Sequence, residues 1–353
     1  NVADEIDIED LIEEQTCAYT LTHFGYIKRQ PTSVYRAQRR GGRGITALSR
    51  KDEDFVEELF LASTHDYILF VTDMGRVYRL KGYQVYEGSR TSRGVNIVNL
   101  LPLQDGEQVT SMLRVPGGDN AEGYLTMVTK AGVIKRTALA NYSNIRKNGL
   151  IAINLNEGDS LAWTRITSGE DELIVATRNG MAIRISENDA RPLGRTATGV
   201  RAIRLAEGDE VVGAGIVREG ATVLTVTEEG KGRRTRIEDY RVQYRGGKGI
   251  RNYGEKGHVA GIRVISEEDD IILISLEGII IRMHAGDINV QSRYGSGVRV
   301  MRLAEGDRVV TVARTERSDE EEVAKPEQDE QEPELTPEEA AALEQAEEQE
   351  SEE

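Results

Sequence analysis

The chain has 353 residues and a formal net charge of −16, and it contains 36 glycines and only 5% aromatic residues. This length allows a sizeable hydrophobic core, and so many glycines are typical of short strands joined by tight turns. No run of eighteen apolar residues occurs, which excludes a transmembrane helix. The single cysteine, Cys17, excludes an intramolecular disulfide bond and is typical of a protein from a reducing cytoplasm.

The first sixteen residues form an acidic segment that we expect to be a linker. Residues 1–16 contain seven Asp or Glu and no Lys or Arg. The segment shows no signal-peptide pattern, and the chain starts at Asn1 rather than Met. We therefore expect a piece of a longer protein.

From residue 17 onward, a hairpin signal recurs six times. Each copy has an apolar residue, then Thr or Ser, two further residues and Gly, with an Arg four residues after the Gly. The apolar, β-branched flanks predict two antiparallel strands joined by a turn whose Gly has a positive φ. Successive hairpin glycines are 50, 57, 48, 50 and 48 residues apart. They are Gly25, Gly75, Gly132, Gly180, Gly230 and Gly278.

A second glycine follows each hairpin glycine after 17 to 19 residues and is itself followed by Ile, Val or Leu. An Arg stands three or four residues before it. A short strand after this Gly, and another after a later Gly-Asp turn, bring each unit to about four strands in roughly fifty residues, the size of a blade in a radial β array. The second glycines are Gly44, Gly94, Gly149, Gly199, Gly249 and Gly297, and the arginines are Arg40, Arg90, Arg146, Arg195, Arg245 and Arg293. We therefore predict an all-β fold of six four-stranded antiparallel blades over residues 17–314.

The first unit contains the densest cationic cluster. Its heptapeptide is Gln38-Arg39-Arg40-Gly41-Gly42-Arg43-Gly44. Guanidinium groups bind phosphate oxygens in pairs, and glycine lets a neighbouring backbone approach and offer its N–H groups. The heptapeptide therefore predicts a surface for a polyanion. A nucleotide phosphate loop is disfavoured because it needs a following helix and a Lys-Ser/Thr pair.

The negative charge is concentrated at the C-terminus. Residues 315–353 carry 18 Asp or Glu against two basic residues. Residues 17–314 carry 43 Lys or Arg against 36 Asp or Glu, a net charge of +7. The acidic tail is rich in Glu, Gln and Pro, so we expect residues 315–353 to be disordered, or at most transiently helical near 337–343. The overall charge thus hides a basic body.

Catalytic and metal-binding patterns are missing from the sequence. His23, His65, His258 and His284 are scattered without metal-ligand spacing, and no nucleophile elbow, Walker A or Cys-x-x-Cys motif occurs. We therefore expect no active site, no metal and no cofactor in this chain.

The hairpin cations allow two interpretations. The Arg four residues after each hairpin Gly is either a phosphate contact or a structural residue whose stem packs on the next unit. The two roles are nearly balanced for Arg184 and Arg282, each of which follows an Ile. Three units have a cationic pair instead, which puts charge on both faces of the strand, so we expect phosphate contact in units one, three and five. The predicted contacts outside the heptapeptide are Lys28, Arg29, Arg76, Arg79, Arg90, Arg93, Lys135, Arg136, Arg146, Lys147, Arg195, Arg233, Arg234, Arg245, Lys248 and Arg293.

The heptapeptide and the six units resemble the C-terminal, DNA-wrapping domain of DNA gyrase A, whose signature residues 38–44 match without departure. The resemblance covers about residues 17–314, and an acidic tail is also frequent in that family. It implies a six-bladed β-pinwheel, a relative of the propeller in which neighbouring blades exchange a strand. It further implies that duplex DNA wraps around the outer rim and that the heptapeptide is required for the wrap.

The same resemblance places the catalytic chemistry outside this chain. It implies a DNA-binding domain of an ATP-dependent type IIA topoisomerase whose catalytic tyrosine, ATP and Mg²⁺ are bound elsewhere. The implied partners are duplex DNA, the rest of gyrase A, and gyrase B in an A2B2 complex, with no membrane. The implied location is the cytoplasm, in association with the nucleoid, and the implied role of the wrap is to enable negative supercoiling.

Two other functions stay open. The corresponding domain of topoisomerase IV usually has a degenerate heptapeptide and often fewer blades, which argues against it. A propeller-type platform for protein partners predicts apolar or aromatic residues on the rim, where this sequence has mostly Arg, Lys and polar residues. The acidic tail either competes with DNA for the rim, which we slightly favour, or only increases solubility.

Overall fold

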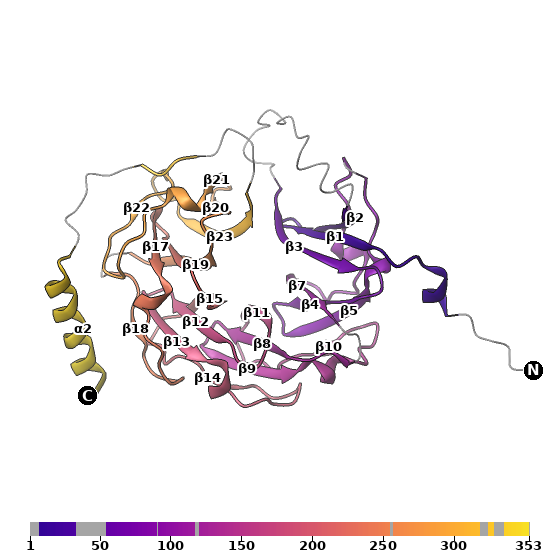
Figure 1. Ribbon diagram of the computed structural model, residues 1–353, viewed down its shortest axis with the longest axis horizontal. Coiled ribbons are helices and arrows are strands. Elements are labelled where there is room, and N and C mark those ends of the chain that lie inside the picture. The colour runs from indigo at the N-terminus through magenta and orange to yellow at the C-terminus, as the bar shows by residue number, and fades with distance from the viewer. Residues whose placement is uncertain are drawn as a thin grey trace, which may run out of the picture.

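The computed structural model describes residues 7–32, 54–89, 91–116, 120–254, 257–317, 324–327 and 335–352. Six antiparallel sheets stand around a common axis, and each sheet is one blade (Figure 1). This arrangement confirms the predicted six-bladed, all-β pinwheel.

Each blade is built around a hairpin, with one further strand on the side facing the axis and, in five blades, a short strand on the outer side. The first hairpin strands are β1 (Thr16–Thr22), β4 (Tyr67–Thr72), β8 (Tyr124–Thr129), β12 (Glu172–Thr177), β16 (Thr222–Thr227) and β20 (Asp269–Ser275). The second hairpin strands are β2 (Tyr26–Pro31), β5 (Arg76–Lys81), β9 (Val133–Ala138), β13 (Met181–Ser186), β17 (Lys231–Arg236) and β21 (Ile280–His284). The inner strands are β3 (Val56–Ser63), β7 (Val109–Val115), β11 (Leu161–Thr167), β15 (Val211–Ile216), β19 (Val259–Ile265) and β23 (Val309–Glu316). The outer strands are β6 (Val95–Asn96), β10 (Leu150–Ile151), β14 (Val200–Arg201), β18 (Ile250–Arg251) and β22 (Val298–Arg299).

The hairpin signal of the sequence is explained by the turn. The Thr22 hydroxyl accepts a hydrogen bond from the Tyr26 backbone N–H at 3.1 Å. The Gly25 N–H donates to the Thr22 carbonyl at 2.9 Å, and Gly25 has a φ of 87°. The same hydroxyl contact recurs at Thr227, where the N–H of the fourth following residue donates at 3.1 Å. A hydroxyl and a residue without Cβ are therefore both required by the turn geometry.

In the first five blades, the outer strand is supplied by the following repeat. β6 belongs to the second repeat but pairs with β2 of the first, with Val95 opposite Ile27. A Cβ on Gly94 would collide with the Ile27 carbonyl oxygen. The second glycine of the repeat is thus the residue that lets the exchanged strand cross the neighbouring blade.

The last blade departs from the predicted four strands. In the described part of the chain its sheet contains three strands, in the order β21-β20-β23. No repeat follows the sixth along the chain, and the residues after Gly44, which hold the outer-strand position of the first repeat, lie outside the described residues.

The hydrophobic core is divided between blades. Five clusters of at least ten buried residues each lie between successive blades, for example one that joins Tyr19 of β1 to Phe70 of β4. The cluster that connects the last blade to the first contains three buried residues among those described, Ile272, Ile274 and Ala313. The junction between the first and last blades is therefore the most weakly packed one in the described structure.

Short helices connect these strands. The 3-10 helices are η1 (Ile8–Leu11), η2 (Gly82–Gln84), η3 (Ile97–Asn99), η5 (Leu139–Tyr142), η6 (Glu187–Asp189), η7 (Ile237–Asp239) and η8 (Ala285–Asp287). In the acidic tail, α2 (Pro337–Glu352) is a helix of 16 residues, longer than the transient helix expected near 337–343. Within the described ranges, no helix has the length and apolarity needed to cross a membrane.

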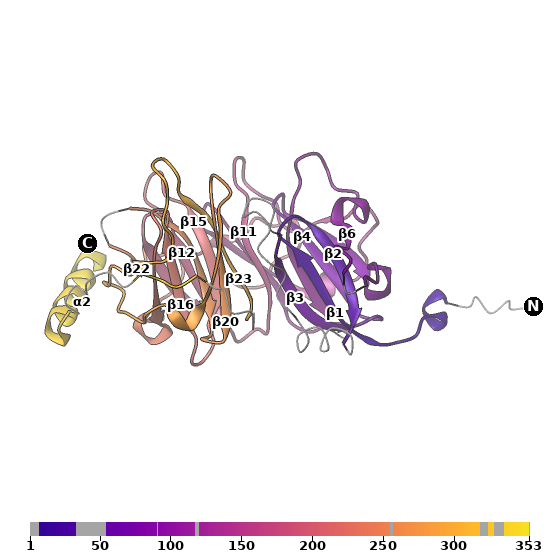
Figure 2. The same ribbon diagram turned by 90° about the horizontal axis from the view of Figure 1, so that it is seen from above.

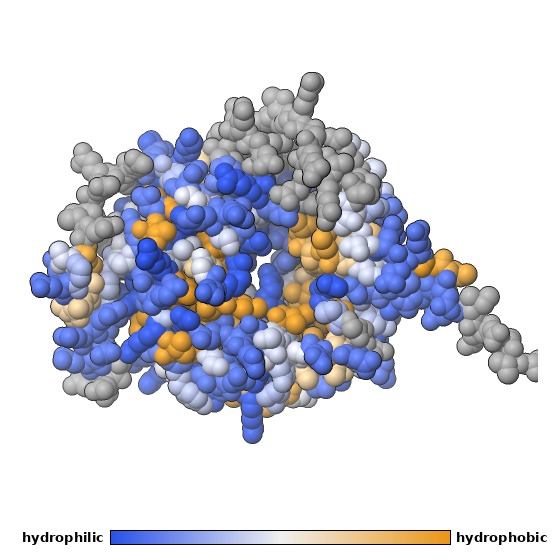
Figure 3. Space-filling view, viewed as in Figure 1, coloured by the Kyte–Doolittle hydropathy of each residue, from blue (hydrophilic) through white to orange (hydrophobic). Residues whose placement is uncertain are grey.

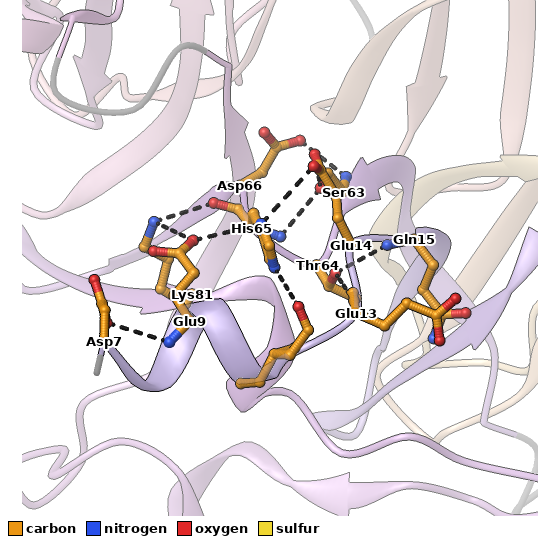
Figure 4. A network of polar contacts seen from close by, with 11 residues as sticks. Asp7, Glu9, Glu13, Glu14, Gln15, Ser63, Thr64, His65, Asp66 and Lys81 are labelled. Atoms are coloured by element: carbon orange, nitrogen blue, oxygen red, sulfur yellow. Dashed lines mark hydrogen bonds and ion pairs between the residues drawn. The ribbon is translucent and has the colours of Figure 1, made fainter.

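The described part of the acidic N-terminal segment lies against the second blade and the turn that enters it (Figure 4). Lys81 Nζ donates to Glu9 Oε1 at 3.0 Å. The His65 ring nitrogen Nε2 lies 2.9 Å from the Ile12 carbonyl oxygen. Residues 7–15 are therefore held on the body of the fold by side-chain contacts, at a defined position relative to the blades.

Candidate nucleic-acid interface

The outer strands and the loops that precede them form the perimeter of the molecule (Figures 1 and 2). Residues around this perimeter are mostly hydrophilic in the view down the axis (Figure 3). The predicted cations fall into three groups here: side chains inside the fold, side chains partly covered, and side chains that face solvent.

The arginines four residues after the hairpin glycines hold the following repeat in place. Arg29 Nε donates to the Val85 carbonyl at 2.8 Å, and Arg234 Nε donates to the Ile288 carbonyl at 2.7 Å. Arg136 of β9 makes the same contact with the following repeat, donating from Nε to the Ala190 carbonyl. Arg136 and Arg234 are each only 4% exposed. These guanidiniums supply hydrogen bonds to carbonyls that would otherwise be buried without a donor.

The cations one position earlier in the hairpin have a similar role. Lys135 is 0% exposed, and its Nζ donates to the Ala152 carbonyl at 2.6 Å. Burial, with a smaller contribution from nearby Arg195, lowers the pKa of Lys135 to about 8. Arg233 is also 0% exposed and donates from Nε to the Ser292 carbonyl at 2.9 Å. Burial lowers the pKa of Arg233 as well.

This placement corrects the expectation that the third and fifth units present their hairpin pairs to phosphate. Lys135, Arg136, Arg233 and Arg234 lie inside the fold and bind backbone carbonyls. The structural role that the sequence analysis considered for Arg184 and Arg282 therefore applies to these four residues. They are no longer candidates for contact with DNA.

The arginines before the second glycines also contact backbone. Arg245 Nε donates to the Asp189 carbonyl at 2.9 Å, and its Nη1 donates to the Arg201 carbonyl at 3.2 Å. Arg293 donates from Nη1 to the Arg251 carbonyl at 2.6 Å and is 4% exposed. Arg293 is covered in part by the tail helix, whose Glu344 and Glu347 pair with it, and Arg245 and Arg195 are half-buried at the perimeter.

Several predicted cations do face solvent. Arg93, with a side chain 56% exposed, stacks 4.0 Å from the centre of the Tyr26 ring. The exposed predicted cations of the described loops are Arg93, Arg146, Lys147 and Lys248. Partly covered predicted cations are Lys28, Arg29, Arg76 and Arg79, of which Lys28 donates to the Ser92 carbonyl at 2.9 Å.

The sequence analysis missed a row of arginines on the outer strands. Arg201 and Arg251 are exposed and Arg299 is half-buried, each being the second residue after a second glycine. Exposed Arg204 and Arg302 follow three residues later in the fourth and sixth repeats. The signal for the row was present in the repeat alignment, since period-2 alternation turns this position away from the buried residue before it.

The heptapeptide 38–44 and Arg90 lie outside the described residues. Their predicted contact with DNA stays a prediction.

The acidic helix α2 lies against the perimeter beside β18 and β22 (Figure 1). Glu344 and Glu347 form ion pairs with Arg293 at 3.6 Å and 3.4 Å. Glu348 forms an ion pair with Arg241 at 3.3 Å. Negative charge from the tail thus covers part of the rim of the fifth blade.

No group of three or more His, Cys, Asp or Glu in the described ranges could hold a metal ion. His23 is paired with Glu57 at 2.9 Å, and this hydrogen bond raises the pKa of His23. A cavity of about 590 Å³ lies between the inner strands, where Arg165 is paired with Glu58 at 3.1 Å.

Comparison with known proteins agrees with this architecture. The sequence profile described as "DNA gyrase C-terminal domain, beta-propeller" matches six successive stretches, residues 19–63, 66–116, 123–168, 171–218, 221–266 and 269–316. These stretches correspond to the six repeats.

Curated relatives extend well beyond this chain. DNA gyrase A of Staphylococcus aureus is 42% identical over 330 residues, which cover 92% of this chain and 37% of that protein. DNA gyrase A of Staphylococcus epidermidis is 43% identical over 321 residues, covering 90% of this chain and 36% of that protein. The chain therefore spans little more than a third of the length of these relatives.

Two solved structures share the fold. The C-terminal domain of DNA topoisomerase IV superposes with a TM-score of 0.76 at 24% identity, covering 86% of this chain and 94% of that one. A DNA gyrase A C-terminal domain superposes with a TM-score of 0.63 at 27% identity, covering 85% and 99%. With six matched units over most of its length, this chain belongs to the family of DNA gyrase C-terminal domains.

Proposed function

We propose that this domain binds duplex DNA without sequence specificity and wraps it around the basic rim. The observation that carries the proposal is the recurrence of exposed cations in the same two segments of several repeats. They lie in the loop before the second glycine, as Arg146 and Lys248 do, and on the outer strand, as Arg201 and Arg251 do. Cations repeated at regular positions match the repeated phosphates of a duplex.

The arrangement of the blades makes this surface curved. Because the outer strands stand around an axis, DNA that touches several of them must bend. Bending 20–30 base pairs by 40–90° costs about 1–6 kcal/mol. Many phosphate contacts are needed to offset this cost, as in other proteins that wrap DNA without base contacts.

The described residues have no element suited to reading base edges. The α-helix that lies wholly among them, α2, has two acidic residues in its first turn and no basic residue in its last. A helix with this charge would be repelled by the phosphates that flank the major groove. Binding through backbone phosphates, with no preferred sequence, is the remaining mode.

The acidic tail competes with DNA in this proposal. The ion pairs of α2 with Arg241 and Arg293 cover the perimeter where DNA would pass. The heptapeptide 38–44 fastens one end of the wrapped DNA, a role that rests on the resemblance of its sequence to the family signature.

In the complete protein, the wrap presents one DNA segment to another with fixed handedness and so enables negative supercoiling. The rest of gyrase A, together with gyrase B in an A2B2 complex in the cytoplasm, supplies DNA cleavage and ATP hydrolysis with Mg²⁺. Support for this comes from the identity to DNA gyrase A of the staphylococci.

A role in a topoisomerase IV is the alternative, favoured by the superposition on that enzyme's C-terminal domain. The intact heptapeptide and the sequence identity to DNA gyrase A favour the gyrase role. A protein-interaction platform would use exposed rim residues such as Tyr244 and Val242, which are 68% and 52% exposed. Tyr86, Ile151 and Val290 are further exposed apolar residues of these loops and outer strands, so DNA binding itself has to separate the two functions.

Topology assays with this chain test the proposal. Nicked circular DNA is incubated with the protein, ligated, and freed of protein. Wrapping predicts a change in linking number that grows with the protein-to-DNA ratio, and tighter binding to long duplexes than to short ones. Binding with no change in linking number would contradict wrapping, and no binding to duplex DNA would favour the protein-interaction platform.

A further inference from the structure

Neighbouring repeats are joined at the outer edge by a contact that recurs along the chain. The carbonyl of the hairpin Arg accepts a hydrogen bond from a backbone N–H in the following repeat. The donor and acceptor pairs are Gly88 to Arg29 at 3.0 Å, Leu193 to Arg136 at 2.9 Å, Gln243 to Arg184 at 2.8 Å and Gln291 to Arg234 at 2.8 Å. The second hairpin strand of each of these blades is thus covered by the next repeat.

A second contact joins the exchanged strand to the same incoming loop. Its acceptor is the carbonyl of the outer-strand residue two positions after the second glycine. Its donor is the guanidinium of the Arg two residues after the N–H donor of the first contact. Arg245 donates to the Arg201 carbonyl at 3.2 Å, and Arg293 donates to the Arg251 carbonyl at 2.6 Å. Both contacts require a following repeat.

In the last blade, a short stretch of the acidic tail makes both contacts. The Ala324 N–H donates to the Arg282 carbonyl at 2.8 Å, which is the first contact. The Glu327 N–H donates to the Arg299 carbonyl at 2.8 Å. This is the second contact, with a backbone N–H as donor in place of the guanidinium. The Glu327 carboxylate also pairs with Arg302.

The side chains of this stretch are seated on the blade as well. Ala324 packs against the hydrophobic cluster between the fifth and sixth blades, and it pairs in parallel with Met283 of β21. Pro326 and Glu327 line a small cavity of about 180 Å³ together with Val298 of β22. The stretch therefore occupies the outer edge of the last blade through backbone, side-chain and charge contacts.

We propose that residues 324–327 are a capping strand, which takes the place of a seventh repeat on the last blade and anchors the acidic tail there. An uncovered strand edge pairs readily with other chains, so a strand supplied in cis protects the last blade from such pairing. The anchor also keeps α2 close to the rim of the fifth blade, and this raises its effective concentration as a competitor. This last consequence rests on the proposed binding of DNA to the rim.

A cysteine cross-link tests the docking of the strand on the full chain. Arg299→Cys with Glu327→Cys places two thiols on residues that pair in antiparallel register. Arg251→Cys with Glu327→Cys is the matched control, because Arg251 holds the same position one repeat earlier. Under mild oxidation we expect the first pair to form an intramolecular disulfide at least tenfold faster than the control. Equal rates would overturn the proposal.

Amide exchange tests the backbone contacts without a variant. The N–H groups of Ala324 and Glu327 are donors, whereas the N–H of Lys325 donates no hydrogen bond within the described structure. We expect the first two to exchange at least tenfold more slowly than Lys325, relative to their intrinsic rates. Protection should persist after deletion of residues 330–353, which removes α2 and leaves the capping strand. Exchange of all three at intrinsic rates would overturn the proposal.

DNA binding tests the anchoring role separately. Ala324→Pro removes the donor to Arg282 and should raise the affinity for duplex DNA toward that of the chain lacking residues 330–353. An Ala324→Pro affinity equal to wild type, when the deletion raises it, would overturn the anchoring role. Failure of all three proteins to bind DNA would instead contradict the proposed function, and the cross-link result would be unaffected.

Discussion

Replacing Arg234 separates a structural arginine from one that binds DNA. Arg234 donates from Nε to the Ile288 carbonyl at 2.7 Å, approaches the Gly286 carbonyl at 3.4 Å and is 4% exposed. Arg234→Met keeps most of the apolar stem but leaves the carbonyl of the buried Ile288 without a charged donor. A hydrogen bond to a charged group contributes about 1.5–3 kcal/mol, so we expect a loss of about 3 kcal/mol in unfolding free energy.

Lys248, in the same repeat, is the matched control because it is exposed and lies in the loop before Gly249. Lys248→Met should change the unfolding free energy by less than about 0.5 kcal/mol. If it contacts one phosphate, it should reduce the slope of log K against log salt by about 0.9.

Urea unfolding and fluorescence anisotropy with a labelled duplex at several salt concentrations measure the two quantities. The expected result is that Arg234→Met loses stability but keeps the salt slope where it is still folded, while Lys248→Met does the reverse. An Arg234→Met protein with wild-type stability and a reduced salt slope would refute the assignment of this arginine to the interior.

Three further changes follow from the same structure. Gly249→Ala should destabilise the fold by more than Gly208→Ala. Both glycines have a positive φ, 80° and 77°, which costs an alanine about 1–2 kcal/mol, but only at Gly249 would the new Cβ also collide with a carbonyl oxygen, that of Ala182. Equal losses of unfolding free energy in urea would contradict the close crossing of the exchanged strand. The pKa of Lys135 is lowered from 10.5 to about 8, so the unfolded chain binds more protons between these values and stability should rise with pH across that window; Lys135→Met should remove this rise in the difference between the two unfolding curves, and identical pH profiles would show that Lys135 is not desolvated. For wild type, about ten engaged cations predict a slope of log K against log salt near −9, measured by anisotropy, and a slope near −2 would be too shallow for a wrapped duplex.

The repeat pattern was sufficient to predict the blades. The hairpin glycines and the Thr or Ser before them satisfy a local turn, as Thr22 and Gly25 show, so their roles are legible within five residues of sequence. The second glycines were recognised by spacing, but the reason for them, the close crossing of Gly94 over Ile27, involves two different repeats.

The candidate site was predicted less completely. A Lys or Arg in a strand has the same sequence signature whether its head group binds a phosphate or a buried carbonyl. Lys135 and Arg233 could therefore not be told apart from Lys147 and Lys248 before the position of the following repeat was known. The outer-strand row with Arg201 and Arg251 was overlooked for the converse reason, since a two-residue strand shows little periodicity of its own.

By itself, the sequence determined the number of repeats, the hairpins, the separation of a basic body from an acidic tail, and the resemblance to the gyrase domain. These features depend on local turn geometry and on composition, which are both read along the chain. Only the tertiary structure decided which cations face solvent, and that a stretch of the tail covers the last blade. Both depend on where the next repeat lies: it buries the hairpin cations of the blade before it, and where no next repeat exists, residues 324–327 occupy its place.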